Sequence, residues 1–211
     1  MFMRVFSSLT MLAVLLMFNP SDVLAASKVG AVGDIVGTIL VKRDGTSVQL
    51  DESSEILLHD VVLTDEGDYV EIIFDDDSYI ALSGDGEFSI NDYAYVEDDP
   101  KKSKADFGVV TSTFKYVSGK IGKQNADNVK MELDFVSIGI RGTTIYRTMD
   151  EGDCLIFLEE GQIVVENNAG SVLMNPLDGT RAGSKDVAPT EPKKWSDERI
   201  AFIKGKAHKP E

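Results

Sequence analysis

Between Val29 and Met174 the chain alternates short apolar runs with turn residues. The runs are rich in Val, Ile, Leu, Phe, Tyr and Thr, and turns such as Asp44-Gly45 and Glu160-Gly161 separate them roughly every ten residues. Runs of this kind are typical of strands in a sandwich, barrel or solenoid. No apolar pattern of helical period extends far in this span. The pattern therefore predicts an all-β domain.

Three stretches of this pattern resemble one another. Each begins with Gly-Asp, continues with an apolar strand and an acidic turn, and ends in a second strand; they start at Gly33, Gly67 and Gly152. One such unit cannot bury both of its faces alone, so repeated units stack on their neighbours. We therefore predict a solenoid-like or β-helical twisted sheet.

The pattern changes after Thr180, where prolines appear and the chain becomes slightly basic. Trp195 to Lys204 is predicted to form a short helix capped by Ser196. Its few apolar residues favour docking on the domain's own sheet, and a membrane or partner contact is the alternative. We expect a β domain over residues 26–180 and a C-terminal tail with a short helix over 181–211.

The first 25 residues have the layout of a secretory signal peptide. Arg4 precedes an apolar run that ends before Asn19-Pro20, and small residues follow. We expect cleavage after Ala25, or alternatively after Ala26, although an uncleaved anchor is an alternative. No later stretch is long enough to span a membrane. The mature protein is therefore expected in the periplasm or outside the cell, without a membrane span.

The composition limits the possible chemistry. The 211 residues carry a net charge of -15 and the sequence pI is about 4.5, which argues against a nucleic-acid partner. Two histidines and one cysteine leave little for metal ligation or nucleophilic catalysis. His59 next to Asp60 has no accompanying Gly-x-Ser-x-Gly motif. We expect no cofactor and no enzymatic activity; a carboxylate pair for glycoside hydrolysis is the alternative.

Charge is segregated along the chain. Asp44 to Pro100 holds 18 acids and no base, whereas Lys101 to Arg147 holds nine bases and four acids. The acidic part could bind a divalent cation such as calcium, which prefers six to eight oxygen ligands. The candidate ligands are Asp75, Asp76, Asp77 and Asp85, with Glu87. The alternatives are a solvated acidic face that protects edge strands, and docking on the basic region within the molecule.

Arg141 is the one charged residue in the run from Phe135 to Tyr146. A buried guanidinium requires carboxylate or carbonyl partners for its five donors. Gly139 and Gly142 flank it and permit close approach of the backbone. We expect Arg141 to join neighbouring strands through carbonyls or an aspartate; holding an anionic group of a partner is the alternative.

Three segments carry a resemblance to a known family. The run Ile138-Gly139-Ile140-Arg141-Gly142-Thr143 resembles the hallmark of the FecR domain, and Ser118 to Ile121 is similar to that family's Gly-Lys-Ile segment. Upstream, the stretches 63–75 and 78–82 resemble its strand pair around an Asp-Gly-Ser turn, with Asp77 in place of the glycine. The resemblance covers residues 33 to 165 and implies an extracytoplasmic, solenoid-like β domain.

The best-known members of that family are membrane-spanning regulators that relay iron-siderophore signals to a cytoplasmic sigma factor. This chain instead opens on a secretory signal, so the resemblance implies only the periplasmic half of such a regulator. We therefore expect a non-enzymatic module that binds an envelope protein and serves in sensing or regulation. The alternative is an envelope protein that binds a cation or a glycan on its acidic face.

Overall fold

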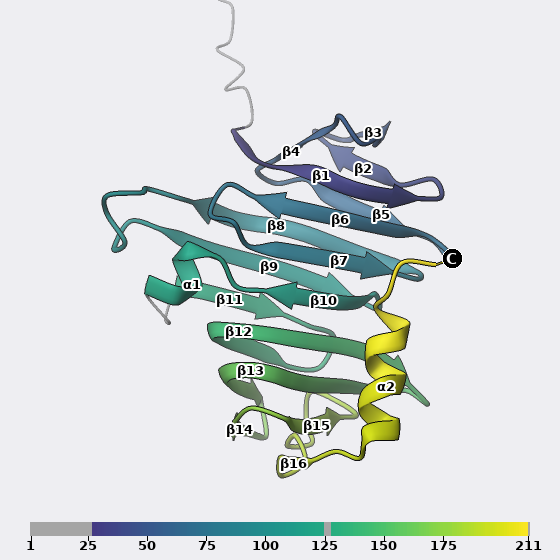
Figure 1. The fold of residues 1–211 in the computed structure, drawn as a ribbon, viewed down its shortest axis with the longest axis vertical. Helices are drawn as coiled ribbons and strands as arrows, with labels where there is room; N and C mark the ends of the chain where they lie inside the picture. Colours follow the sequence, from purple (N-terminus) through teal and green to yellow (C-terminus); the bar gives the residue numbers. More distant parts are fainter. Residues whose placement is uncertain (1–26, 125–127, 211) are drawn as a thin grey trace, which may run out of the picture.

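The computed structural model describes residues 27–124 and 128–210. The expected signal peptide and its cleavage sites at Ala25 and Ala26 lie outside these residues. Strands make up most of the described chain, and a short helix follows near the C-terminus (Figure 1). Neither described helix is long and apolar enough to cross a membrane. The expected all-β class with a C-terminal helix is confirmed.

The elements follow one another along the chain in the order of their labels. The strands are β1 (Lys28–Val36), β2 (Leu40–Arg43), β3 (Thr46–Gln49), β4 (Glu55–Leu57), β5 (Val61–Thr64), β6 (Tyr69–Phe74), β7 (Tyr79–Ser83), β8 (Gly86–Ala94), β9 (Lys104–Val110), β10 (Thr113–Val117), β11 (Val129–Glu132), β12 (Ser137–Asp150), β13 (Asp153–Asn167), β14 (Gly170–Met174), β15 (Asp178–Ala182) and β16 (Lys193–Lys194). The helices are α1 (Lys120–Gln124) and α2 (Asp197–Lys206).

All sixteen described strands belong to one sheet that curls into two facing layers. The first layer runs β3-β2-β5-β8-β9-β11 and the second β4-β1-β6-β7-β10 (Figure 1). Strand β12 joins the layers, because its first half pairs with β11 and its second half with β10. Strand β13 pairs with β12 along both halves. The result is a curled open sheet, closed on one side by these two long strands.

Two glycines allow β12 and β13 to turn from one layer into the other. The register between the strands shifts between Arg141 and Ile145, next to Gly142 and opposite Gly161. Both glycines have positive φ, at 58° and 84°. A Cβ on Gly161 would lie 2.2 Å from the carbonyl oxygen of Gly142. Because only glycine tolerates both the dihedral and the close approach, this bend is fixed by the sequence.

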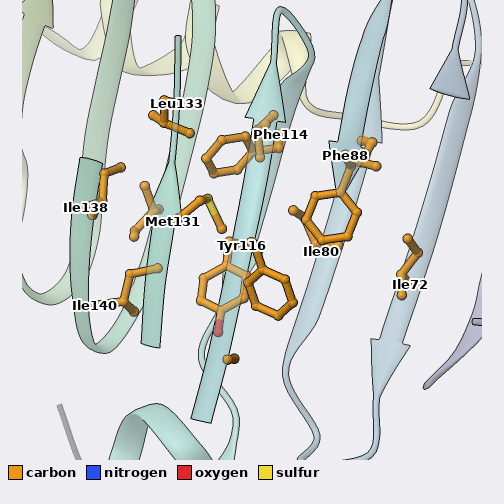
Figure 2. Packing of buried hydrophobic residues seen from close by; sticks show 14 of the residues in the cluster. Ile72, Ile80, Phe88, Phe114, Tyr116, Met131, Leu133, Ile138 and Ile140 are labelled. Carbon is orange, nitrogen blue, oxygen red and sulfur yellow. The ribbon is translucent and has the colours of Figure 1, made fainter. Parts of the chain in front are cut away.

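The core lies between the two layers and is rich in aromatic rings. The ring of Phe74 in β6 lies 5.0 Å from that of Phe107 in β9, and Phe107 lies 6.3 Å from Tyr116 in β10. Figure 2 shows Ile138 and Ile140 of β12 directed into this core. Alternate residues of strands such as β5, β9 and β10 enter the core, as expected for a sheet with one buried face.

The three similar sequence stretches adopt three different structures, so the curled sheet is not a clear solenoid. The stretch from Gly33 passes from β1 in one layer to β2 in the other. The stretch from Gly67 forms the β6–β7 hairpin. In the stretch from Gly152, the expected turn at Gly161 is a bend inside the continuous strand β13. Strand pairing, which the local pattern does not specify, decides each outcome.

Helix α2 packs on the outer face of the second layer, as expected for a docked tail. Its N-cap is Ser196, whose hydroxyl accepts a hydrogen bond from the backbone N–H of Arg199. Ile203 is buried against Phe157 and its neighbours, and Trp195 stacks on the Phe157 ring at 6.0 Å. Figure 1 shows the helix lying across the ends of β12 and β13.

Candidate functional site

The three segments that resemble the FecR family meet in the fold, and we call their meeting point the motif junction. It comprises the β6–β7 turn around Asp76, residues 118–121, and Thr143 of β12. Asp76 is 1% exposed, and its carboxylate accepts hydrogen bonds from the Tyr93 hydroxyl at 3.0 Å and the Ile121 N–H at 3.1 Å. Burial and the neighbouring Asp76 charge raise the pKa of Tyr93 well above its ordinary value. The carboxylate therefore has a structural role.

Residues 118–121 link this turn to β12. The Ser118 N–H donates to the Thr143 carbonyl oxygen, and the Thr143 N–H donates to the Ser118 hydroxyl, both at 2.9 Å. Gly119 lies so close to the turn that a Cβ would stand 2.3 Å from the Asp76 carbonyl oxygen. The motif junction therefore ties the β6–β7 hairpin to the strand that joins the two layers.

The structure does not bring the candidate cation ligands together. Asp76 points into the motif junction, whereas Asp75 and Asp77 are exposed and Asp77 pairs with Lys120 at 2.9 Å. Asp85 lies in the β7–β8 turn, at the opposite end of β7. Throughout residues 27–124 and 128–210, no three Asp, Glu, His or Cys side chains gather closely enough to hold a metal ion. Asp75, Asp76 and Asp77 point in different directions because they are adjacent residues of one tight turn, and Asp85 belongs to another turn.

The expectation of a buried Arg141 is wrong. Ile138 and Ile140 are fully buried, so the alternation of β12 places Gly139 and Arg141 on the opposite, exposed face. Within the described chain the Arg141 guanidinium has no ion pair and no side-chain hydrogen bond, so it joins no neighbouring strands. The remaining motif residues, Gly142 and Thr143, form the bend and the junction.

The buried arginine of this sheet is Arg147, six residues further along β12. Its guanidinium is fully buried and donates to the carbonyl oxygens of Thr111 and Ser112 and to the Asp134 carboxylate, while Nε contacts the Cys154 sulfur at 3.4 Å. The network joins the β9–β10 and β11–β12 connections to β12 and β13. The sequence carries one signal for this placement. Residues two apart in a strand lie on the same face, so Arg147 shares the inner face with the apolar Ile145.

The surroundings of the cysteine Cys154 and the histidine His59 do not indicate a catalytic role for either. Cys154 is buried, and this burial raises the pKa of its thiol. His59 is exposed in the turn after β4, with φ of 71°. Its neighbour Asp60 is buried and forms an ion pair with Arg43 at 2.7 Å. Asp60 therefore serves that pair, and it does not orient a histidine base.

The comparisons with known proteins give a likeness of fold. Two crystal structures of a candidate anti-sigma factor from Parabacteroides distasonis superpose with TM-scores of 0.54 and 0.51, each at 7% identity and over 69% of this chain. The matched part spans 64% and 65% of those chains, which is less than two thirds of their length. No family model and no curated protein matches the sequence. At this identity the likeness shows the fold alone.

Arg141 lies beside a shallow hollow on the outer face of β11, β12, β13 and β14, which we call the outer groove. Its volume is about 330 Å³. Helix α2 does not cover it, since α2 packs on the second layer. The residues that line it include Lys130, Gly139, Arg141, Gln162, Val164, Glu166 and Leu173.

Proposed function

We propose that this chain is a non-enzymatic, FecR-like module of the cell envelope that binds another protein in a sensing or regulatory role. The observation that carries the proposal is that the residues of the Ile138–Thr143 motif differ in burial. Ile138, Ile140 and Thr143 are buried in the fold, whereas Arg141 stands exposed beside the outer groove. An exposed guanidinium with no ion pair and no side-chain hydrogen bond among the described residues contributes little to stability and is available for a protein partner.

Two further points support a protein-binding role. The two superposed structures are of a candidate anti-sigma factor, a regulator named for its action on another protein, the sigma factor. The outer groove also combines apolar and charged residues, which is the usual composition of a protein interface. The envelope location rests on the expected signal in residues 1–25.

The test is affinity capture from an envelope extract with immobilised residues 26–211, in calcium and in chelator, read by mass spectrometry. An unrelated acidic protein of similar net charge serves as the control bait. We expect one protein enriched over the control under both conditions, and a reduced yield with Arg141→Glu. Enrichment only in calcium would favour the cation-binding alternative, and no enrichment over the control would refute the proposal.

A further inference from the structure

Three registered rows of side chains cross the outer groove, and their chemistry differs. In the first row, Glu132 of β11 lies opposite Ser137 of β12, which lies opposite Glu166 of β13. The Ser137 hydroxyl donates to the Glu166 carboxylate at 3.5 Å, a weak contact. Two carboxylates therefore flank one small residue at this end of the groove.

The second row has apolar side chains next to Gly139, which leaves open space above the sheet. Gly139 lies between Lys130 and Val164, and Val164 lies opposite Leu173 of β14. Val164 is 40% exposed and Leu173 is 51% exposed. A Cβ built on Gly139 would meet no atom within 4 Å. The groove thus has room for an apolar side chain above Gly139, against Val164 and Leu173.

The third row is cationic. Arg141 lies opposite Gln162, and the Lys123 side chain lies near Gly142, the next residue along β12. Lys130, the base of the second row, is less available than Arg141, because it forms an ion pair with Glu132. The hydrogen bond from the Lys130 ammonium to the Glu132 carboxylate is the main reason why the pKa of Lys130 is raised. Among the described residues that line the groove, Arg141 is therefore the cation without an ion pair, and Glu166 is the carboxylate without an ion pair at the other end.

The rows are two residues apart on β12, a spacing of roughly 6.8 Å that equals the spacing of alternate side chains in any extended chain. We propose that the outer groove binds an extended segment of the partner protein with a basic, an apolar and an acidic side chain at positions i, i+2 and i+4. The basic residue meets Glu166, the apolar residue covers Gly139, and the acidic residue meets Arg141. This inference rests on the proposed function and names the partner's chemistry.

A charged polymer of one sign does not fit this arrangement. A polyanion that meets Arg141 would be repelled at Glu166. An extended peptide can meet both ends, because its alternate side chains lie on one face. Charge complementarity along the groove therefore favours a mixed-charge strand.

The test uses defined peptides and anisotropy of a terminal fluorophore. The probe is Thr-Lys-Thr-Leu-Thr-Glu-Thr, and the two controls carry Lys at both ends of the triplet or Glu at both ends. Reversing the order is not a control, since the peptide can bind in the opposite direction. We expect the probe to bind at least about fivefold more tightly than either control. Arg141→Glu is expected to shift the preference to the peptide with two lysines.

Gly139→Val tests the floor of the groove without straining the backbone. Its φ is not positive and a Cβ there meets no neighbour, so the fold is expected to remain. The added side chain should weaken probe binding about tenfold by filling the hollow. The matched control is Ser47→Val, which adds the same side chain on exposed strand β3 of the same layer. Equal binding of the three peptides, or an unchanged affinity in Gly139→Val, would overturn the proposal.

The outcomes separate this inference from the proposed function. If the original chain and Gly139→Val capture the same partner equally, the proposed function is supported and the outer groove is not the binding site. Probe binding with the expected preferences, but without any captured protein, supports the groove and counts against the envelope role.

Discussion

Two arginines on one strand show how position decides what a residue does. Arg141 is exposed, whereas Arg147 is fully buried and satisfied by two carbonyls and a carboxylate. The two positions are six residues apart, so regular alternation would place both side chains on one face; the bend at Gly142, with its register shift, reverses the faces between them. The same residue type is therefore a surface group in one place and the centre of a core network in the other.

Replacing each arginine should separate these roles. Arg147→Ala is expected to lower the free energy of unfolding by about 3–5 kcal/mol, because it leaves the Asp134 carboxylate without its buried partner. Arg141→Ala is expected to change it by less than about 0.5 kcal/mol. Urea unfolding followed by circular dichroism measures both. If Arg147→Ala does not fold, Arg147→Lys, which keeps the charge, should fold with reduced stability; equal stabilities of the two alanine variants would contradict the assignment.

Two glycines offer a similar contrast. Gly119→Ala is expected to destabilise by about 1–3 kcal/mol, since the new Cβ would stand 2.3 Å from backbone atoms of the β6–β7 turn. Gly139→Ala meets no neighbour and should be neutral or slightly stabilising. Thermal unfolding of both variants provides the measurement. A stable Gly119→Ala would mean that the motif junction is looser than its geometry indicates.

At the scale of elements, helix α2 is held by a small number of contacts. Ile203 and Ala207 are its buried apolar anchors, and Lys204 pairs with Glu159 and lies over the Tyr146 ring. Burial acts to raise the pKa of Glu159, but the hydrogen bond and charge of Lys204 outweigh it and lower the pKa. A short helix with so few anchors depends on this pair more than a large interface would.

The pair makes helix docking sensitive to acid. Because the folded-state pKa of Glu159 is lowered, its contribution is complete above the ordinary value of 4.5 and disappears as the pH falls through the lowered value. We expect the original chain to exceed Glu159→Gln in stability by at most about 1 kcal/mol at pH 7, and by less than this at pH 3. Urea titrations at both pH values, with fluorescence of the sole tryptophan, Trp195, as the probe, measure it. A difference that grows in acid would contradict this account.

At the scale of the whole molecule, β12 and β13 hold the two layers together. Strand β12 pairs with β11 of the first layer through Ser137–Gly139 and with β10 of the second layer through residues 144–147, and β13 pairs with β12 along both parts. The layers face each other across one continuous hydrophobic cluster. Unfolding of either layer therefore exposes the other, and the molecule is expected to unfold as one cooperative unit.

Hydrogen exchange should reveal this arrangement. The amides of residues 144–147 and 155–157 are expected to exchange most slowly, because they lie in buried strands with a partner on each side. Strand β3, which is exposed throughout and pairs only with β2 among the described strands, should exchange far faster. Exchange followed by mass spectrometry distinguishes the strands. Similar protection of β3 and β12 would refute the central role of the long strands.

Local patterns in the sequence were sufficient for several features. Alternation and turn residues predicted the strands, and Ser196 predicted the start of the C-terminal helix, because these signals act over a few residues. The resemblance also selected three segments that the structure brings together in the motif junction. Their proximity was not visible in the sequence, since they are far apart along the chain.

The sequence by itself determined the β class, the strand-forming runs, the bend glycines and the helix cap, since each depends on the preferences of neighbouring residues. Only the tertiary structure decided which strands pair, that three similar stretches fold differently, that Asp76 points inward, and that Arg147 is buried in place of Arg141. These outcomes depend on contacts between residues distant in the chain. Pairing over such distances is set by the packing of the whole core, which no local pattern encodes.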